Sequence, residues 1–112
     1  MNDSNCIFCK IILNQVPTQK IIETNDLIVI KDINPQAPIH YLIIPKTHIS
    51  NLQTTKKDDQ LLLGAMLLVT KELSKNLKQP QDFRIISNNG ALVGQSVFHL
   101  HFHFLAGKSF TE

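Results

Sequence analysis

This 112-residue sequence contains a single arginine and no glycine-rich loop of the kind that binds phosphate. Arg84 is its only arginine, so no pair of guanidinium groups can clamp a di- or triphosphate, and no Walker or GxGxxG motif is present. The formal net charge is only +2. Apart from Lys56 and Lys57 the lysines are scattered, which leaves no basic stripe to follow a nucleic-acid backbone. We therefore expect no nucleic-acid partner.

Long apolar runs are missing too. No segment approaches the roughly 20 consecutive apolar residues of a membrane span, and residues 1–10 lack the basic start and apolar run of a secretory signal. Hydrophobic residues nevertheless make up 43% of the chain and charged residues 18%, which excludes wholesale disorder. We expect one folded domain over residues 1–112, located in the cytoplasm and without a membrane partner.

Regular structure is indicated in three stretches of the first half. Residues 6–13 have helix-like apolar spacing and stop before Pro17, which predicts a short N-terminal helix. Leu27 to Lys31 and Ile39 to Ile44 are rich in β-branched residues and predict strands. Two prolines in the segment that joins these strands predict a shaped loop there.

One long helix is predicted from Asp58 to Lys78, with Thr55 as a candidate cap and Pro80 after its end. Its apolar residues extend most of the way round its N-terminal half, which is wider than the single stripe of a surface helix. We expect one side to contact the sheet and another to contact a second subunit. A helix sandwiched inside the monomer is the alternative. These apolar residues are Leu61, Leu62, Leu63, Ala65, Met66, Leu67, Leu68, Val69, Leu73 and Leu77.

The last third predicts two more strands, Phe83 to Ser87 and Val97 to Leu105, joined by a glycine-bearing loop. Strands paired around loops, with one long helix, favour an α+β fold on an antiparallel sheet. Amides, a hydroxyl and backbone N–H groups in the loop could surround one phosphoryl group, although such a loop is also typical of a plain turn. Its donors are Asn88, Asn89, Gly90, Gly94, Gln95 and Ser96.

Three histidines alternate with apolar residues near the end of the chain. On a strand, this period of two sends His99, His101 and His103 to one face and the apolar residues to the other. The outer two backbones would lie about 13 Å apart, so the row cannot chelate one ion. It suits an extended anion, with one nitrogen attacking and a neighbour donating a hydrogen bond. A merely polar sheet surface is the alternative.

The segment 94–105, GQSVFHLHFHFL, resembles the signature of the histidine triad (HIT) family. Residues 32–49 resemble the upstream region of its Hint-like branch, and residues 6–12 resemble the bacterial N-terminus of that branch, with Cys6 and Cys9 in C-x-x-C spacing. The resemblance covers nearly the whole chain. It implies a HIT-like fold of about five strands and a homodimer whose sheets join across the symmetry axis.

The resemblance also implies a role for each matching residue. His101 would be the nucleophile that forms a nucleotidyl-histidine intermediate. His103 would hydrogen-bond the phosphate and, with Ser96, help the leaving group depart. Asp32 would accept the ribose hydroxyls. The remaining substrate-binding candidates are Asn88, Gly94 and Gln95 near the phosphate, Phe8, Ile11, Ile30 and Ile33 at the base, and His40 near the site in a less defined role.

A structural zinc ion is the cofactor that the resemblance implies. Two cysteines in C-x-x-C spacing indicate a metal site or a redox pair more readily than a structural disulfide. In zinc-containing members of the family two histidines complete the set, which here would be Cys6, Cys9, His48 and His99. Two buried or free cysteines are the alternative.

The function implied is a purine nucleoside phosphoramidase that cleaves adenosine 5'-phosphoramidate-type substrates to AMP. Hydrolysis of dinucleoside polyphosphates, as in the Fhit branch, fits the same histidines but not the Pro-Gln-Ala-Pro loop at residues 35–38. A nucleotide-binding scaffold with incidental hydrolysis is a third reading. The branch commonly continues in a tail past the position of Glu112, so the resemblance leaves the leaving group open.

Overall fold

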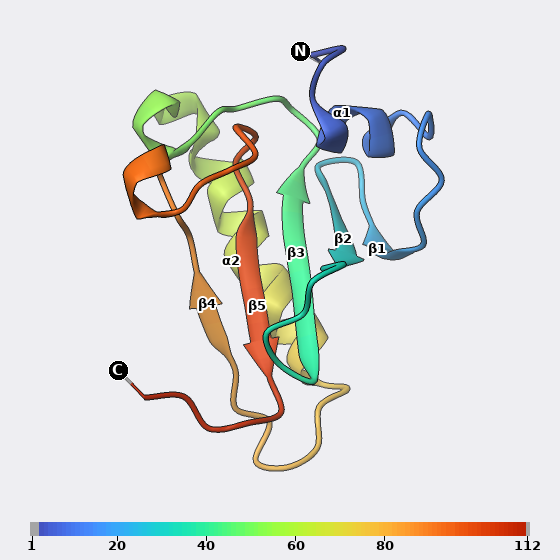
Figure 1. The fold of residues 1–112 in the computed structure, drawn as a ribbon, viewed down its shortest axis with the longest axis vertical. Coiled ribbons are helices and arrows are strands. Elements are labelled where there is room, and N and C mark those ends of the chain that lie inside the picture. Colours follow the sequence, from blue (N-terminus) through green and yellow to red (C-terminus); the bar gives the residue numbers. More distant parts are fainter. Residues whose placement is uncertain (1–2, 112) are drawn as a thin grey trace.

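The computed structural model describes residues 3–111, and its five strands form one antiparallel sheet in the order β1-β2-β3-β5-β4 (Figure 1). This confirms the predicted α+β class, with one long helix and a short N-terminal one. The elements are α1 (Ile7–Ile12), β1 (Lys20–Glu23), β2 (Leu27–Lys31), β3 (Ile39–Pro45), α2 (Gln60–Ser74), β4 (Arg84–Ile86) and β5 (Phe102–Ala106), with short 3₁₀ turns at Leu52–Thr54, Lys57–Asp59 and Ala91–Val93.

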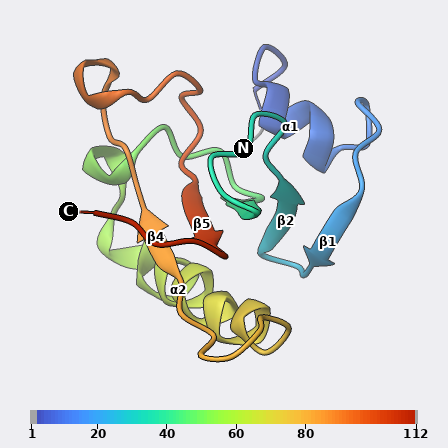
Figure 2. The ribbon, with the colours of Figure 1, turned by 60° about the horizontal axis from the view of Figure 1, so that its bottom comes forward.

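Both faces of the central strands are buried, and each face packs against a different helix. Leu27 and Val29 of β2 belong to a core cluster with Met66 and Leu73 of α2. Ile28 and Ile30 of the same strand face the other way and pack with the apolar side of α1. Figure 2 shows α2 beneath the sheet, with α1 on the opposite side. Because side chains alternate along a strand, sequence parity decides which helix each residue meets.

The pairing of β3 with β5 places the histidines of these strands on the α1 face. Leu42 pairs with His103, and Ile43 pairs with Phe102. Ile43 and Phe102 point into the α2 cluster, whereas Leu42 belongs to the α1 cluster. The alternation then directs His103 to the α1 side.

Two expectations for the long helix were wrong. The α-helix runs from Gln60 to Ser74, shorter than predicted at both ends, because its first turn is a 3₁₀ turn and Lys75 already ends it. Thr55 does not cap the helix, since its Oγ1 donates to the carbonyl of Leu52, 2.7 Å away.

The described residues contain no helix with the length and apolar character needed to cross a membrane.

The expected strand at 97–105 begins five residues late, at Phe102. Residues 97–99 form a bend, and the N–H of Leu100 donates to the carbonyl of Ile49 at 2.6 Å instead of joining the sheet ladder. Only His103 of the three alternating histidines therefore lies in a strand. The prediction also missed β1 (Lys20–Glu23), which has no fully buried residue to mark it as a strand.

Phe104 offers a test of the core. It is fully buried between Phe83 and Tyr41, with ring centroids 4.8 and 6.0 Å from its own. We predict that Phe104→Ala lowers the free energy of unfolding by about 3–5 kcal/mol in urea titrations, because it removes an aromatic side chain and leaves a cavity. Leu92→Ala, at a fully exposed leucine, should change it by less than about 0.5 kcal/mol. Equal unfolding midpoints for the two variants would contradict this account of the core.

Candidate functional site

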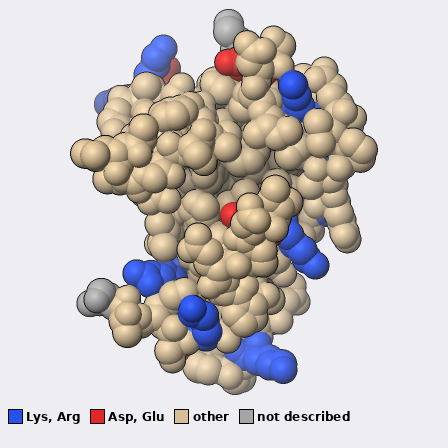
Figure 3. Space-filling view, in the orientation of Figure 1, with Lys and Arg blue, Asp and Glu red and all other residues tan. Residues whose placement is uncertain are grey.

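A pocket of ≈ 520 Å³ lies on the α1 face of the sheet, within the range of about 300–1,000 Å³ that is usual for small-molecule sites. Its wall combines an apolar end with a polar end. The face that carries it is hollowed near its middle, and its charged side chains lie in separate spots (Figure 3). The lining residues are Ile7, Phe8, Ile11, Ile30, Lys31, Asp32, Ile33, Asn34, Gln36, Leu42, Asn88, Gly94, Ser96, Val97, His101 and His103.

His101 lies just before β5, and one of its ring nitrogens is already engaged. Its Nδ1 lies 2.7 Å from the carbonyl oxygen of His99, to which it donates. A neutral imidazole has one N–H, so Nε2 of His101 carries a lone pair. The ring also meets Phe8 edge-on, with centroids 5.2 Å apart, which fixes its plane. His101 can therefore act as a nucleophile or a base toward a group in the pocket.

His103, two residues later, touches a buried polar group. Its Nδ1 lies 2.9 Å from Nε2 of His40, and the latter lies 3.3 Å from Oδ2 of Asp32. His40 is only 4% exposed, so it stands behind His103 and Asp32 and does not line the pocket. The carboxylate of Asp32 also accepts the N–H of Asn34 at 2.8 Å, which orients it at the rim.

The pKa values of these histidines favour neutral rings. Burial lowers the pKa of His101, and the bond to the His99 carbonyl and the charge of Asp32 only partly offset it. Burial lowers the pKa of His103 to about 4, helped by the neighbouring His101 and His40. Both rings are thus neutral at neutral pH, so each has one nitrogen with a proton and one with a lone pair.

Gln95 is a correction to the predicted phosphate contacts. Its side chain is 4% exposed, and its amide is fully used inside the protein. Oε1 accepts the N–H of Gly90 at 2.9 Å, and Nε2 donates to the carbonyls of Ser50 and Val97 at 2.8 and 3.1 Å. Gly94 follows the 3₁₀ turn with φ +106°, a conformation that favours glycine. Gln95 therefore shapes the loop that presents Gly94 and does not line the pocket.

Most of the expected substrate-binding residues are brought together. Phe8, Ile11 and Ile30 line the apolar end, and Ile33 stands at the rim, 91% exposed. At the polar end are Asp32, Asn88, Gly94, Ser96, His101 and His103. The sequence prediction missed Ile7, Lys31, Asn34, Gln36, Leu42 and Val97.

A simple signal could have found one of the missed residues. Leu42 lies two residues after His40 on a predicted strand, so alternation alone places it on the histidine face. Lys31 is the last residue of β2, whereas Ile7, Asn34, Gln36 and Val97 lie in loops or at the start of a helix, where no period applies. Their place in the wall depends on loop geometry.

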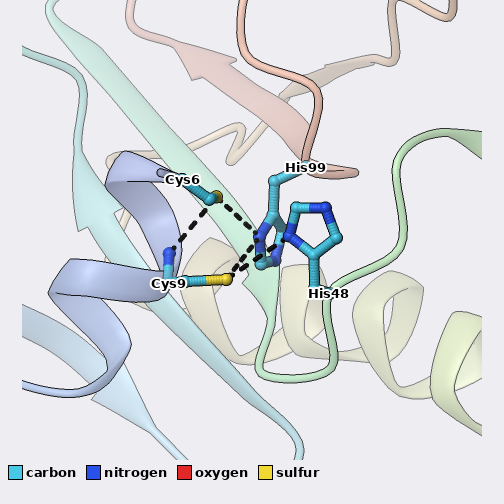
Figure 4. Close-up of side chains that lie close together, drawn as sticks. All are labelled: Cys6, Cys9, His48 and His99. Atoms are coloured by element: carbon cyan, nitrogen blue, oxygen red, sulfur yellow. Dashed lines mark hydrogen bonds between the residues drawn. The ribbon is translucent and has the colours of Figure 1, made fainter. Parts of the chain in front are cut away.

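The four expected metal ligands converge beside this pocket (Figure 4). Their ligand atoms all lie within 4.8 Å of one another. His99 Nδ1 is 3.2 Å from the sulfur of Cys6 and 3.6 Å from that of Cys9, and His48 Nδ1 is 3.3 Å from the sulfur of Cys9. Three parts of the chain bring these groups together: the start of α1 with its cap residue Cys6, the segment after β3 that holds His48, and the residues before β5.

The donor set fits a metal ion. His99 Nε2 lies 2.8 Å from the carbonyl of Pro45 and donates to it, so the lone pair of the ring is on Nδ1, facing the thiols. Burial lowers the pKa of His99 to about 4, which keeps the ring neutral as a ligand must be. Burial raises the pKa of the Cys6 thiol. A thiolate at that position therefore needs a nearby cation, and a Cys₂His₂ set is one that zinc prefers.

The cluster of two cysteines and two histidines also adjoins the pocket. A smaller hollow of ≈ 280 Å³ is bordered by Cys6 and His48 and shares Ile7, Ser96 and Val97 with the larger one. His99 joins the two sites directly, because its ring faces the cysteines while its carbonyl accepts from His101.

Comparison with curated proteins identifies close relatives over nearly the full chain. An uncharacterized HIT-like protein of Synechocystis is 45% identical over 105 residues, which is 94% of this chain and 92% of the relative. Protein HitA of Neisseria gonorrhoeae is 43% identical over 101 residues, covering 90% and 94% of the two chains. The relatives and this chain are thus similar in length as well as in sequence.

Solved structures agree. A HIT family hydrolase from Clostridium thermocellum matches with a TM-score of 0.93 and 38% identity, over 99% of this chain and 97% of its own. A histidine triad protein from Clostridium difficile matches with a TM-score of 0.94 and 34% identity, over 100% and 98%. The family described as scavenger mRNA decapping enzyme, C-terminal binding, matches residues 5–111. The chain therefore belongs to the histidine triad family.

Proposed function

We propose that this protein is a purine nucleoside phosphoramidase, which hydrolyses adenosine 5'-phosphoramidate-type substrates to AMP and an amine. The observation that carries the proposal is the state of His101. Its Nδ1 donates to the His99 carbonyl, so a bare Nε2 is held in a pocket of nucleotide size. The similarity to solved structures of HIT family hydrolases supports a hydrolytic reaction.

The nucleotide would lie along the pocket with its base at the apolar end. Phe8, Ile11 and Ile30 offer an apolar wall there, and Asp32, at the rim, offers carboxylate oxygens to the ribose hydroxyls. Asn88, Ser96 and the backbone near Gly94 supply neutral donors at the polar end. This division of the wall favours a nucleoside monophosphate unit over a free sugar phosphate.

The reaction proceeds in two displacements. In the first, the lone pair of His101 Nε2 forms a bond to phosphorus while the phosphorus–nitrogen bond to the leaving group breaks. The amine leaves with a proton that Ser96 and His103 help to deliver. In the second, water attacks the phosphorus, the bond to His101 breaks, and AMP is released. One substrate and one water molecule thus give one AMP and one amine, and the histidine is restored.

We also propose that Cys6, Cys9, His48 and His99 hold a structural zinc ion. All four positions of a tetrahedral site would be filled by protein, which is typical of structural zinc and leaves no position for substrate. When bound, the ion supplies the charge that stabilises the two thiolates. The thiols must stay reduced for this role, which suits a cytoplasmic location.

A homodimer is the third part of the proposal. Leu61 and Leu68, one above the other on α2, are 90% and 70% exposed. β4 lies at the end of the sheet with one side unpaired in the described residues. Fully burying a leucine contributes about 1.5–3 kcal/mol, so a partner that covers this helix and continues the sheet from β4 would stabilise both chains.

His101→Ala tests the nucleophile. We predict that it reduces hydrolysis of an adenosine 5'-phosphoramidate by at least about 10³-fold, because general-base or nucleophilic groups contribute on that scale. AMP affinity should change little, which serves as the control for folding. Brief mixing of the wild-type protein with substrate at low temperature, followed by peptide mass spectrometry, should detect an AMP adduct on His101.

Near-wild-type turnover by His101→Ala would contradict the covalent mechanism. Faster turnover of a diadenosine polyphosphate than of the phosphoramidate would replace the substrate class. AMP binding without turnover of either compound would favour a nucleotide-binding scaffold.

Metal analysis tests the zinc site. Purified protein should contain about one zinc per chain, and Cys9→Ser should contain far less, because a serine hydroxyl is a poor zinc ligand. Removing zinc with a chelator should lower the melting temperature, since an ion at a thousandfold excess over its dissociation constant stabilises the folded state by about 4 kcal/mol. Protein that is produced in zinc-supplemented medium and still contains no metal would argue against the site.

Sedimentation tests the dimer. The wild-type protein should sediment at twice the mass of the 12.7 kDa chain, whereas Leu61→Glu with Leu68→Glu should sediment as a monomer, because two carboxylates cannot be buried at an apolar contact. Lys20→Glu, in β1 at the opposite end of the sheet from β4, makes the same total change in charge, serves as the control and should remain dimeric. A wild-type monomer at micromolar concentration would reject this part of the proposal.

A further inference from the structure

The loop between β2 and β3 determines which nitrogen of His40 carries the proton. The backbone N–H of Gln36 donates to Nδ1 of His40 over 3.0 Å. A ring nitrogen that accepts a hydrogen bond has its lone pair there, so His40 carries its proton on Nε2.

The same reasoning extends one residue further, to His103. The Nε2–H of His40 lies 2.9 Å from Nδ1 of His103, a normal hydrogen-bond length, and 3.3 Å from Oδ2 of Asp32. Because a proton on His103 Nδ1 would face this N–H at close range, His103 Nδ1 carries the lone pair and accepts. The Asp32 carboxylate is 4.0 Å from that nitrogen, too far to accept a proton from it. The ring proton of His103 is thus left on Nε2, the nitrogen that does not face His40.

We propose that His40 is a positioning residue that, with the Gln36 amide, fixes His103 in the tautomer presenting Nε2–H to the nucleotide pocket. The tautomer follows from the hydrogen-bond chain alone, whereas its use on a phosphate rests on the proposed function. His40 is 4% exposed, so water cannot readily replace either of its partners. The chain runs from a backbone amide, which has a single possible role, through two rings to the pocket.

This arrangement gives the two pocket histidines opposite roles. His101 presents a lone pair because its N–H is used by the His99 carbonyl. His103 presents an N–H because its lone pair is used by His40. The pair therefore matches a phosphoryl group, in which phosphorus accepts electrons and the oxygens accept hydrogen bonds. The opposite tautomer of His103 would direct a second lone pair at the phosphate oxygens.

The chain also distinguishes two clusters that are both compact enough for a metal ion. Asp32, His40 and His103 place their ligand atoms within 4.8 Å of one another, as the cysteine cluster does. However, the His40 nitrogen that faces this group carries a proton and has no lone pair to offer. The His99 nitrogen that faces the cysteines has its lone pair available, because the other nitrogen donates to Pro45. The first cluster is therefore a hydrogen-bond relay and the second is a ligand set.

Nitrogen NMR on protein labelled in its histidine rings reads these tautomers directly. In the wild-type protein without ligand, His103 should have a protonated Nε2 and an unprotonated Nδ1, with its signals assigned by their loss in His103→Gln. His40→Leu removes the donor, and the proton of His103 should then populate Nδ1. His40→Gln keeps an N–H at the corresponding position and should preserve the wild-type tautomer.

AMP titration adds a functional readout to the same variants. His40→Leu should bind AMP at least about tenfold more weakly than His40→Gln, because it weakens the hydrogen bond from His103 to the charged phosphate. A wild-type His103 protonated on Nδ1, or an unchanged His103 tautomer in His40→Leu, would overturn the inference. Should His40→Leu fail to fold, the wild-type spectrum decides alone. Failure of the wild-type protein to bind AMP would count against the proposed function and not against the tautomer.

Discussion

His99 is held through both ring nitrogens and its carbonyl, and the two sites of the molecule depend on that placement. One nitrogen donates to the Pro45 carbonyl at the end of β3, and the other faces the thiol of Cys6. Its carbonyl accepts from His101 at 2.7 Å. A displacement of this residue would change the ligand geometry and the tautomer of His101 together. The bend before β5 exists because these bonds replace the ladder hydrogen bonds of a longer strand.

The position of the bend also explains why three similar histidines have three different roles. His99 precedes the strand and turns toward α1, where it is fully buried. His101 reaches the pocket from the last residue before β5, and His103 reaches it from inside the strand. Identical side chains thus differ in burial and in hydrogen-bond partner because of the path of the backbone. Phe102 and Phe104, between and after them, anchor the segment in the α2 cluster.

Much of the fold could be predicted from periodicity, and much of the site from residue type. Leu27–Lys31 was predicted with the correct bounds, because four consecutive apolar residues in a strand that is covered on both faces leave a strong signal. The extent of the last strand could not be predicted, because alternation continues through residues 97–101 while backbone groups of this segment bond to Ile49 and to the side chains of Gln95 and His101. The sequence predicted Gln95 as a phosphate contact because a glutamine amide can donate hydrogen bonds. In the structure three backbone groups already bond to this amide.

The cysteine cluster joins residues from the two ends of the chain. Cys6 and His99 are 93 positions apart, and Cys9 and His99 are 90 apart. An ion held there would act as a cross-link that closes a loop of most of the chain, and closing a loop of that length restricts the unfolded ensemble by about 4 to 5 kcal/mol in the chain-entropy description. During synthesis, Cys6 and Cys9 emerge about ninety positions before His99. A four-ligand site could therefore form only after the segment before β5 has been made, which would make capture of a metal ion a late step in folding.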